Sequence, residues 1–270
     1  MKFVTNTLAL VLTAVAAAVP RGRIRFGLFG LAAKLGRNVP RRLLTVPGGV
    51  VVHAGVWRIE TIEQWSKLVG PSGRLVAVEA DQANYENLHR EIKRRAIQNV
   101  ELINKAVWNE STRLKFQVST ISAWGKLKSA GVEVDPERFN AEIEVAAEPL
   151  DSILAELNVA SVDHLTLTVN GAELEALAGA KTLLSRATAT VSVRISHPDA
   201  AFQDRLAGDV RTALGTSGYK VATLISRQLD FTGSGNDARG ITVYAFPTRR
   251  RLVQEPATSS SADAPLRRAA

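Results

Sequence analysis

One carboxylate, that of Glu79, lies at the position where a βαβ unit of this kind would bind a nucleotide. Glu79 directly follows the apolar run Leu75 to Val78, and an acid at the end of the second strand of a βαβ unit commonly accepts hydrogen bonds from ribose hydroxyls. The first turn of the same unit contains only Gly55, where close approach of a ligand usually requires two or three glycines. Trp57 and Arg58 occupy positions where small residues are expected. Some of the residues that usually form a nucleotide-binding site are therefore replaced by other types.

Strands that alternate with helices must position these residues. Hydrophobic periodicity predicts strands at 50–52, 75–78, 100–103, 114–118, 143–145, 164–169, 190–195, 219–225 and 241–246, with helices ending near 68 and at 82–96, 150–157, 172–184 and 200–214. Asp81 is the expected N-cap of the second helix, and Asp151 the expected start of the third. This order indicates an α/β fold with a doubly wound, mostly parallel sheet and one antiparallel strand at its end.

Two predicted strands, 114–118 and 143–145, are expected to form a hairpin set apart from the main sheet. The segment between them, Ser119 to Asn140, is long and polar, which is typical of lids and substrate-binding loops.

The composition predicts one large domain with extensions. The chain has 270 residues, 46% of them hydrophobic, and no cysteine, which excludes disulfides, thiolate metal sites and cysteine nucleophiles. We divide it into an apolar segment at 1–20, a basic lead-in at 21–47, an α/β body at 48–248 and a disordered basic tail at 249–270.

The positive charge lies outside the body. The net charge is +8, but residues 21–42 hold seven basic residues and no acid, and 249–270 hold five arginines, so residues 43–248 carry a net charge of −3. A nucleic-acid-binding domain would carry basic residues on its folded surface, so nucleic acid is not an expected partner. Basic ends fit a membrane surface better.

The N-terminal segment admits three interpretations. Residues 3–20 carry no charge and reach the lower length limit for spanning a bilayer. They could be a membrane anchor or interfacial helix, a signal peptide cleaved near Ala18, or a helix packed on the body. The arginines that follow favour retention on the cytoplasmic side. We expect residues 1–42 to contact a membrane surface, with a cytoplasmic location as the alternative.

At this point the order of elements resembles the FkbM-type family of S-adenosylmethionine-dependent methyltransferases, over about residues 48–246. The resemblance is carried by LVGPSGRLVAVEADQANYENL, NVELINKAVWNE, PLDSIL, VDHLTLTVNGAELEALAGAKTLL and VSVRISHP, in family order and spacing. It implies a class I methyltransferase-like, Rossmann-like sheet of seven strands with S-adenosylmethionine at the carboxyl ends of the strands. It also implies O-methylation of small molecules or sugars.

The departures from the family pattern remove acids. The family usually reads Asp-x-Gly-Ala-Asn-x-Gly after the first strand, where this chain keeps only Gly55. The fourth strand usually ends Lys-x-Asp-Val-Glu-Gly-x-Glu, and on the fifth an acid precedes the hydrophobic-His pair. The positions that no longer carry an acid are His53, Thr168, Asn170 and Arg194. All four replacements remove negative charge. We interpret this as the loss of a requirement to bind a cation or metal, or as a new preference for an anionic ligand.

The candidate site residues follow from these matches and from chemistry. Cofactor-binding candidates are Gly55, Trp57, Glu79 and Asn104; catalytic candidates are His53, Glu173 and His197; no metal ligand is predicted. His53 could act as a base, but a lone histidine at a strand end is more often structural. Glu173 could be a base, or it could simply suit the N-terminus of a helix. Trp57 could stack on an adenine or fill the cofactor's space, and Arg58 would repel a sulfonium.

Two functions remain open. One is an active, membrane-associated enzyme that methylates a small-molecule, lipid-linked or glycan hydroxyl. The other, which the lost acids favour, is a methyltransferase-like protein with impaired or lost catalysis, acting as a binding or scaffold module. A dinucleotide-binding oxidoreductase is disfavoured by the single glycine in the first turn.

Overall fold

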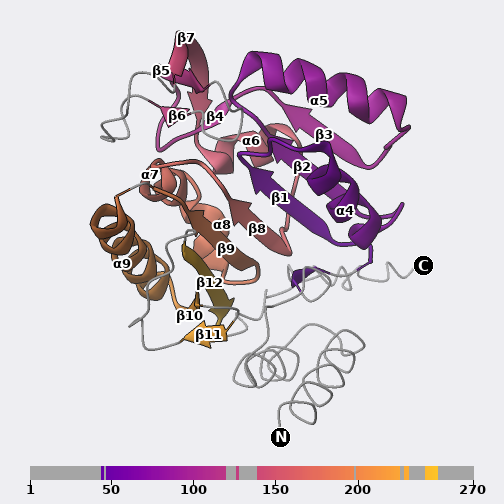
Figure 1. The fold of residues 1–270 in the computed structure, drawn as a ribbon. Helices are drawn as coiled ribbons and strands as arrows, with labels where there is room; N and C mark the ends of the chain where they lie inside the picture. The colour runs from indigo at the N-terminus through magenta and orange to yellow at the C-terminus, as the bar shows by residue number, and fades with distance from the viewer. Residues whose placement is uncertain are drawn as a thin grey trace, which may run out of the picture.

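The computed structural model describes residues 44–45, 47–119, 126–127, 139–197, 199–225, 228–230 and 241–248. Two β-sheets and flanking helices make up this part of the chain (Figure 1). The main sheet contains β1 (Val50–Ala54), β2 (Arg74–Val78), β3 (Val100–Ile103), β8 (His164–Leu167), β9 (Thr190–Ile195), β10 (Tyr219–Ile225), β11 (Gln228–Asp230) and β12 (Ile241–Pro247). The second sheet contains β4 (Ala106–Val107), β5 (Thr112–Ser119), β6 (Lys126–Leu127) and β7 (Phe139–Glu148). The helices are α4 (Ile59–Val69), α5 (Gln82–Arg94), α6 (Leu150–Glu156), α7 (Glu173–Ala178), α8 (Lys181–Arg186) and α9 (Ala200–Thr216).

The main sheet reverses its winding at β1. Its strand order is β11-β10-β12-β9-β8-β1-β2-β3, and β1 pairs in parallel with both β2 and β8. The chain proceeds from β1 to β2 and β3 on one side, and later fills the other side with β8 and β9. Ligands of open α/β sheets bind beyond the carboxyl ends of the strands at such a switch point.

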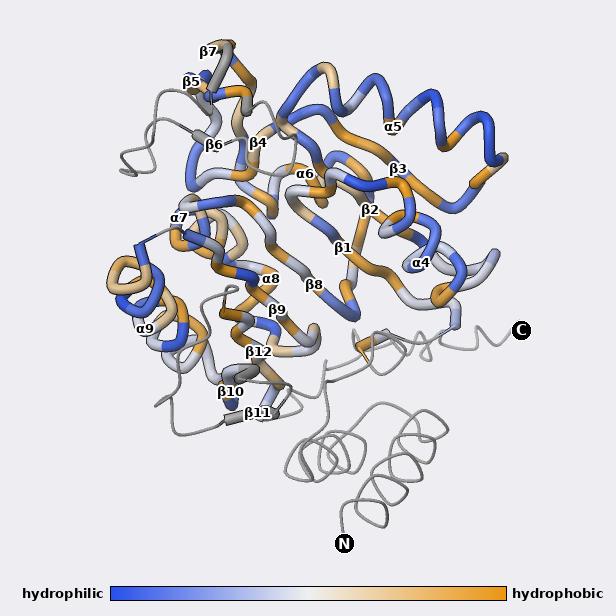
Figure 2. The backbone as a smooth tube through the Cα atoms, viewed as in Figure 1, coloured by the Kyte–Doolittle hydropathy of each residue, from blue (hydrophilic) through white to orange (hydrophobic). Residues whose placement is uncertain are grey.

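Helices cover both faces because the central strands are apolar on both sides. On one face, Ile62 and Trp65 of α4 pack with Val51 and Leu75 in one buried cluster, which Leu88 of α5 also joins. On the other face, side chains of α6, α7, α8 and α9 pack on the main sheet. The outward part of α5 is largely hydrophilic (Figure 2), as expected for a helix that buries one stripe only.

The predicted α/β class, with its doubly wound and mostly parallel sheet, is confirmed. Within the described residues the main sheet has eight strands rather than seven, because the three-residue β11 extends its edge. Two strands run against the others where one was expected: β12, which inserts between β9 and β10, and β11, which pairs antiparallel with β10 at the edge of the sheet. The separate hairpin is also confirmed, as β5 and β7 pair antiparallel in the second sheet.

Two predictions about helices were wrong. Residues 172–184 form two helices, α7 and α8, because Ala180 leaves helical geometry, with φ −113° and ψ 25°. The preceding Gly179 packs closely on another segment, since an added Cβ would lie 1.9 Å from the Trp108 carbonyl oxygen. Asp151 does not start α6, whose N-cap is Pro149. Its carboxylate instead accepts hydrogen bonds from the backbone N–H groups of Thr182 and Leu183 at the start of α8, at 2.6 and 3.0 Å. The N-cap prediction for Asp81 is correct.

The predictions for residues 1–42, for the tail at 249–270 and for most of Ser119 to Asn140 fall outside the described residues. Across the part of the chain that the structure describes, no helix combines the length and hydrophobicity that crossing a membrane requires.

Replacing Gly179 with alanine should destabilise the protein by more than about 2 kcal/mol, because backbone atoms must move to admit the Cβ. Gly208 in α9 is the matched control, since an added Cβ there meets nothing within 4 Å. Gly208→Ala should stabilise by roughly 0.5–1 kcal/mol through helix propensity. Urea unfolding followed by circular dichroism measures both, and equal effects of the two variants would contradict the packing explanation.

Candidate functional site

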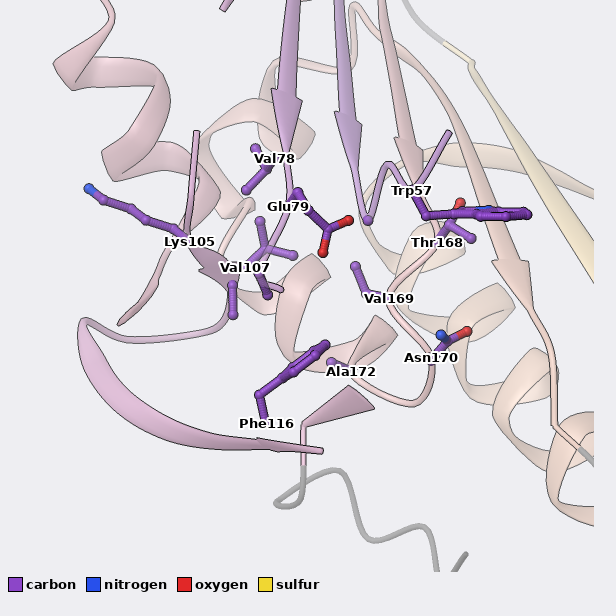
Figure 3. Close-up of a pocket in the computed structure, with 13 residues that line it drawn as sticks. Trp57, Val78, Glu79, Lys105, Val107, Phe116, Thr168, Val169, Asn170 and Ala172 are labelled. Carbon is purple, nitrogen blue, oxygen red and sulfur yellow. The ribbon is translucent and has the colours of Figure 1, made fainter. Parts of the chain in front are cut away.

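A pocket lies at the switch point, beyond the carboxyl ends of β1, β2 and β8. Its walls come from the β1 turn with Gly55 and Trp57, from the end of β2 with Glu79, from the β8 turn with Asn170, and from Phe116 of the second sheet (Figure 3). The cavity volume is about 50 Å³. The location agrees with the rule for doubly wound sheets, but the space is small.

Glu79 is the buried acid of this pocket, and in Figure 3 its carboxylate lies among the lining side chains. Its Oε1 accepts a hydrogen bond from the backbone N–H of Asp81 at 2.8 Å. Burial raises the pKa of Glu79 from 4.5 to about 7, although that hydrogen bond and one from Asn84 oppose the rise. Asn104 does not line the pocket; its amide donates to the Glu79 carbonyl at 2.9 Å and so holds the strand end.

Gly55 is required by the protein itself. Its φ is +80°, and a Cβ at this position would lie 1.9 Å from the carbonyl oxygen of Thr168. Its N–H donates to the carbonyl of Val78 at 2.9 Å. The residue therefore joins the end of β1 to the ends of β2 and β8. The glycine in the first turn is explained by this packing, whether or not a ligand approaches it.

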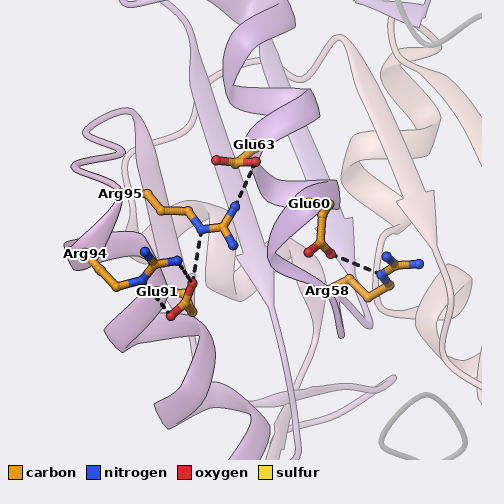
Figure 4. Close-up of polar contacts among 6 residues, drawn as sticks. All are labelled: Arg58, Glu60, Glu63, Glu91, Arg94 and Arg95. Carbon is orange, nitrogen blue, oxygen red and sulfur yellow. Dashed lines mark hydrogen bonds and ion pairs between the residues drawn. The ribbon is translucent and has the colours of Figure 1, made fainter.

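The side chains of Trp57 and Arg58 point in different directions. Trp57 lines the pocket and is 40% exposed, so its ring lies at the mouth. Arg58 is not among the lining residues and forms an exposed ion pair with Glu60 at 3.1 Å (Figure 4), with its guanidinium 5.3 Å from the centroid of the Trp57 ring. The predicted repulsion between Arg58 and a bound sulfonium is reduced by this neighbouring carboxylate.

None of the three catalytic candidates lines the pocket. His53 is buried, and because side chains alternate along a strand it shares its sheet face with Val51, the face that α4 covers. His197 lies in the turn before α9, where its Nδ1 accepts from the Asp199 N–H at 3.0 Å and its ring packs on Phe202 at 4.5 Å. The fold therefore does not bring these two histidines to Glu79.

Glu173 is fully buried at the start of α7 and supports the β8 turn. Asn170 and Gly171 both have positive φ, and Glu173 Oε2 accepts from the Gly171 N–H at 2.9 Å. Its Oε1 has no hydrogen-bond partner among the described residues. Burial raises the pKa of Glu173 to about 7. This side chain fixes the turn that presents Val169 and Asn170 to the pocket.

The four strand-end positions that lack the family's acid do not all lie at the pocket. Thr168 and Asn170 line the pocket, whereas His53 and Arg194 do not. Arg194 is exposed near the end of β9 and donates to the Thr242 hydroxyl at 3.5 Å.

Sequence reasoning missed Phe116 and Lys105 as lining residues. The alternation of Leu114, Phe116 and Val118 indicated an apolar strand face, but not that this face lies over the end of the main sheet. Lys105 Nζ forms an ion pair with Glu148 at 2.7 Å. Its positive charge is therefore already compensated.

A sequence model of the Methyltransferase FkbM domain matches residues 50–221. The chain belongs to the FkbM methyltransferase family. The match runs from β1 into β10 and takes in every strand end that borders the pocket. The resemblance expected from the sequence motifs, and the class I methyltransferase-like fold that it implied, are confirmed.

A comparison with curated proteins finds no match. Among solved structures, the FkbM methyltransferase of Methylobacillus flagellatus is 13% identical with a TM-score of 0.47, covering 88% of this chain and 58% of that chain. Fibrillarin of Aeropyrum pernix, solved with bound S-adenosyl-L-methionine, is 17% identical with a TM-score of 0.44, covering 80% and 74%. This chain thus spans 58% of the Methylobacillus protein, and its family assignment rests on the sequence model.

The site only partly suits the family's cofactor. Glu79 provides a carboxylate where ribose hydroxyls would need an acceptor. The cavity of about 50 Å³ is too small for an adenosyl group, because pockets that bury small-molecule ligands measure roughly 300–1,000 Å³. Among the described residues, no group of three or more His, Asp and Glu side chains is placed to hold a metal ion.

Replacing Glu173 with glutamine should stabilise the protein increasingly as pH rises from 5 to 8. The folded-state pKa of Glu173, about 7, exceeds its ordinary 4.5, so the wild type loses stability as pH rises between these values. Glutamine keeps an acceptor for the Gly171 N–H and does not ionise. The difference in unfolding free energy should grow by roughly 3 kcal/mol, measured by urea unfolding at both pH values. A difference that does not change with pH would contradict this account.

Proposed function

We propose that this chain binds the adenosyl part of S-adenosylmethionine at Glu79 and that its methyl-transfer activity is impaired or lost. Membership of the FkbM family supports the choice of cofactor. The observation that carries the proposal is the buried carboxylate of Glu79 at the carboxyl end of β2, beside the switch point of the sheet. That is where doubly wound folds hold a ribose.

The arrangement of Glu79 suits a ribose diol. The carboxylate accepts from the Asp81 N–H at Oε1 and is also hydrogen-bonded by Asn84 and by the backbone of Ala80. Since a carboxylate has about four acceptor positions, it can still accept from a ribose hydroxyl. Asn104 fixes the backbone from which the side chain projects. The apolar side chains of Val107 and Val169 border the same pocket and offer contact to a purine ring.

Reduced catalysis follows from the groups that are in place. Methyl transfer to a hydroxyl needs the acceptor oxygen in line with the methyl group and usually a base for its proton. Among the lining residues the only titratable side chains are Glu79 and Lys105, and Lys105 is paired with Glu148. Thr168 and Asn170, on the β8 side, cannot take a proton at neutral pH. The site therefore offers cofactor recognition without a second acid–base group.

Replacing Glu79 with glutamine should weaken the binding of S-adenosylhomocysteine at least tenfold at pH 8, because an amide accepts hydrogen bonds more weakly than a carboxylate. Isothermal titration calorimetry of the full chain measures the dissociation constants. Glu110→Gln, an exposed carboxylate outside the pocket, is the matched control and should leave binding unchanged.

The same titration should depend on pH through Glu79. The carboxylate is mostly ionised at pH 8 and about one tenth ionised at pH 6, given its pKa of about 7. Affinity should therefore fall by up to about tenfold from pH 8 to pH 6 in the wild type, and not in Glu79→Gln. The absence of any binding at millimolar ligand would overturn the proposed function.

The alternative is an active O-methyltransferase at a membrane. It predicts release of S-adenosylhomocysteine when vesicles that carry lipid-linked glycans are offered together with S-adenosylmethionine. Sustained turnover in that assay would contradict impaired catalysis. The fold and the family are common to both functions, so this assay distinguishes them.

Membrane association through residues 1–42 is a separate part of the proposal, supported by the clustering of positive charge there. The full chain should sediment with vesicles containing anionic phospholipid, and less so at high salt. Neutralising Arg21, Arg23 and Arg25 to glutamine should weaken binding by up to roughly a hundredfold, since each charge contributes about 1 kcal/mol at such a surface. Neutralising Arg267 and Arg268 is the control, and an equal loss there would argue against a specific N-terminal contact.

A further inference from the structure

Phe116 limits the size of the pocket around Glu79. Its ring is buried, with 6% of the residue exposed, and projects toward the middle of the pocket near Ala172 (Figure 3). It belongs to a buried cluster with Ala106, Ala172 and Val145. Among the lining residues it is the largest side chain that is buried, because the only larger one, Trp57, is 40% exposed at the mouth.

The ring is carried by a strand outside the main sheet. Phe116 lies on β5, whose partners β6 and β7 also belong to the second sheet. That sheet is fastened at its base, where the Trp108 N–H donates to the Glu148 carbonyl at 2.9 Å and Lys105 pairs with Glu148 at 2.7 Å. Phe116 lies eight residues beyond Trp108. The ring is therefore carried by a strand that no ladder pairing joins to the main sheet.

We propose that Phe116 is a specificity-determining residue of this pocket: its ring occupies the place of the nucleobase, and an adenosyl ligand binds only when the ring is displaced. The proposal rests on the proposed function for the identity of the ligand. Removing a large buried side chain opens a cavity on the order of 150 Å³. Added to the present 50 Å³, this approaches the lower end of the volumes that hold small-molecule ligands.

The Phe116 ring affects ligand affinity by shifting the equilibrium between a closed pocket, which the ring fills, and an open pocket, which can bind the ligand. If the binding-competent state is only a small fraction of the molecules, the apparent dissociation constant rises by that factor. Removing the ring makes every molecule competent. An aromatic platform on which the base stacks would behave in the opposite way, because its removal would weaken binding.

The test compares Phe116→Ala with the wild type by calorimetric titration of the full chain with S-adenosylhomocysteine. We expect the variant to bind at least tenfold more tightly. Phe246→Ala is the matched control, since Phe246 is also 6% exposed but packs in the cluster under α4, and it should leave the affinity unchanged. If Phe116→Ala fails to fold, Phe116→Val gives a smaller change in the same direction. Unchanged or weaker binding, with the wild type still binding, would overturn the proposal and leave the proposed function standing.

A second measurement needs no ligand. On this proposal the ring keeps water from Glu79, so its removal should lower the pKa of the carboxyl group from about 7 toward 4.5. Carbon-detected NMR of the carboxyl group measures that pKa. If neither protein binds S-adenosylhomocysteine, both the proposed function and the role of Phe116 in specificity fail, and this titration decides only whether the ring fills the pocket. A fall in the pKa then supports the ring as the group that fills the pocket, and an unchanged pKa overturns that assignment too.

Discussion

Close packing of three strand ends around Gly55 is the constraint on which the site depends. The residue donates its N–H to the end of β2 and lies against the Thr168 carbonyl at the end of β8, with a backbone conformation that side chains other than glycine rarely adopt. This contact joins the two halves of the sheet at the point where its winding reverses. It determines where the β1 turn leaves the sheet, and hence that Trp57 lies at the mouth of the pocket.

Two buried carboxyl groups are arranged around this junction with different tasks. Glu79 lines the pocket, whereas Glu173 lies beneath the β8 turn and holds the Gly171 N–H. Burial raises the pKa of each to about 7, so both change charge near neutral pH. Buried ionisable groups that no partner compensates lower stability, and such groups are found mostly where a site requires them.

The strand-end residues that replace acids fall into two groups in the structure, those that line the pocket and those that do not. Thr168 and Asn170 border the pocket, so their lack of charge alters the chemistry that it can perform. His53 points to the sheet face under α4, and Arg194 is exposed and near Thr242 on the neighbouring strand. The common direction of change seen in the sequence therefore does not correspond to a single surface. Only the first pair bears on ligand binding in the described structure.

The sequence by itself determined the order of elements, the mostly parallel sheet, the family and the place of Glu79, because hydrophobic periodicity and motif spacing are local properties of the chain. It could not determine the close packing of Gly179 on the Trp108 carbonyl, which lies 71 residues earlier in the chain. Only the tertiary structure decided that Phe116 enters the pocket, that Arg58 turns to Glu60, and that His53 and His197 stay away from Glu79. Each of these depends on the direction of a side chain and on how the second sheet lies over the first, and both are set by packing between segments distant in sequence.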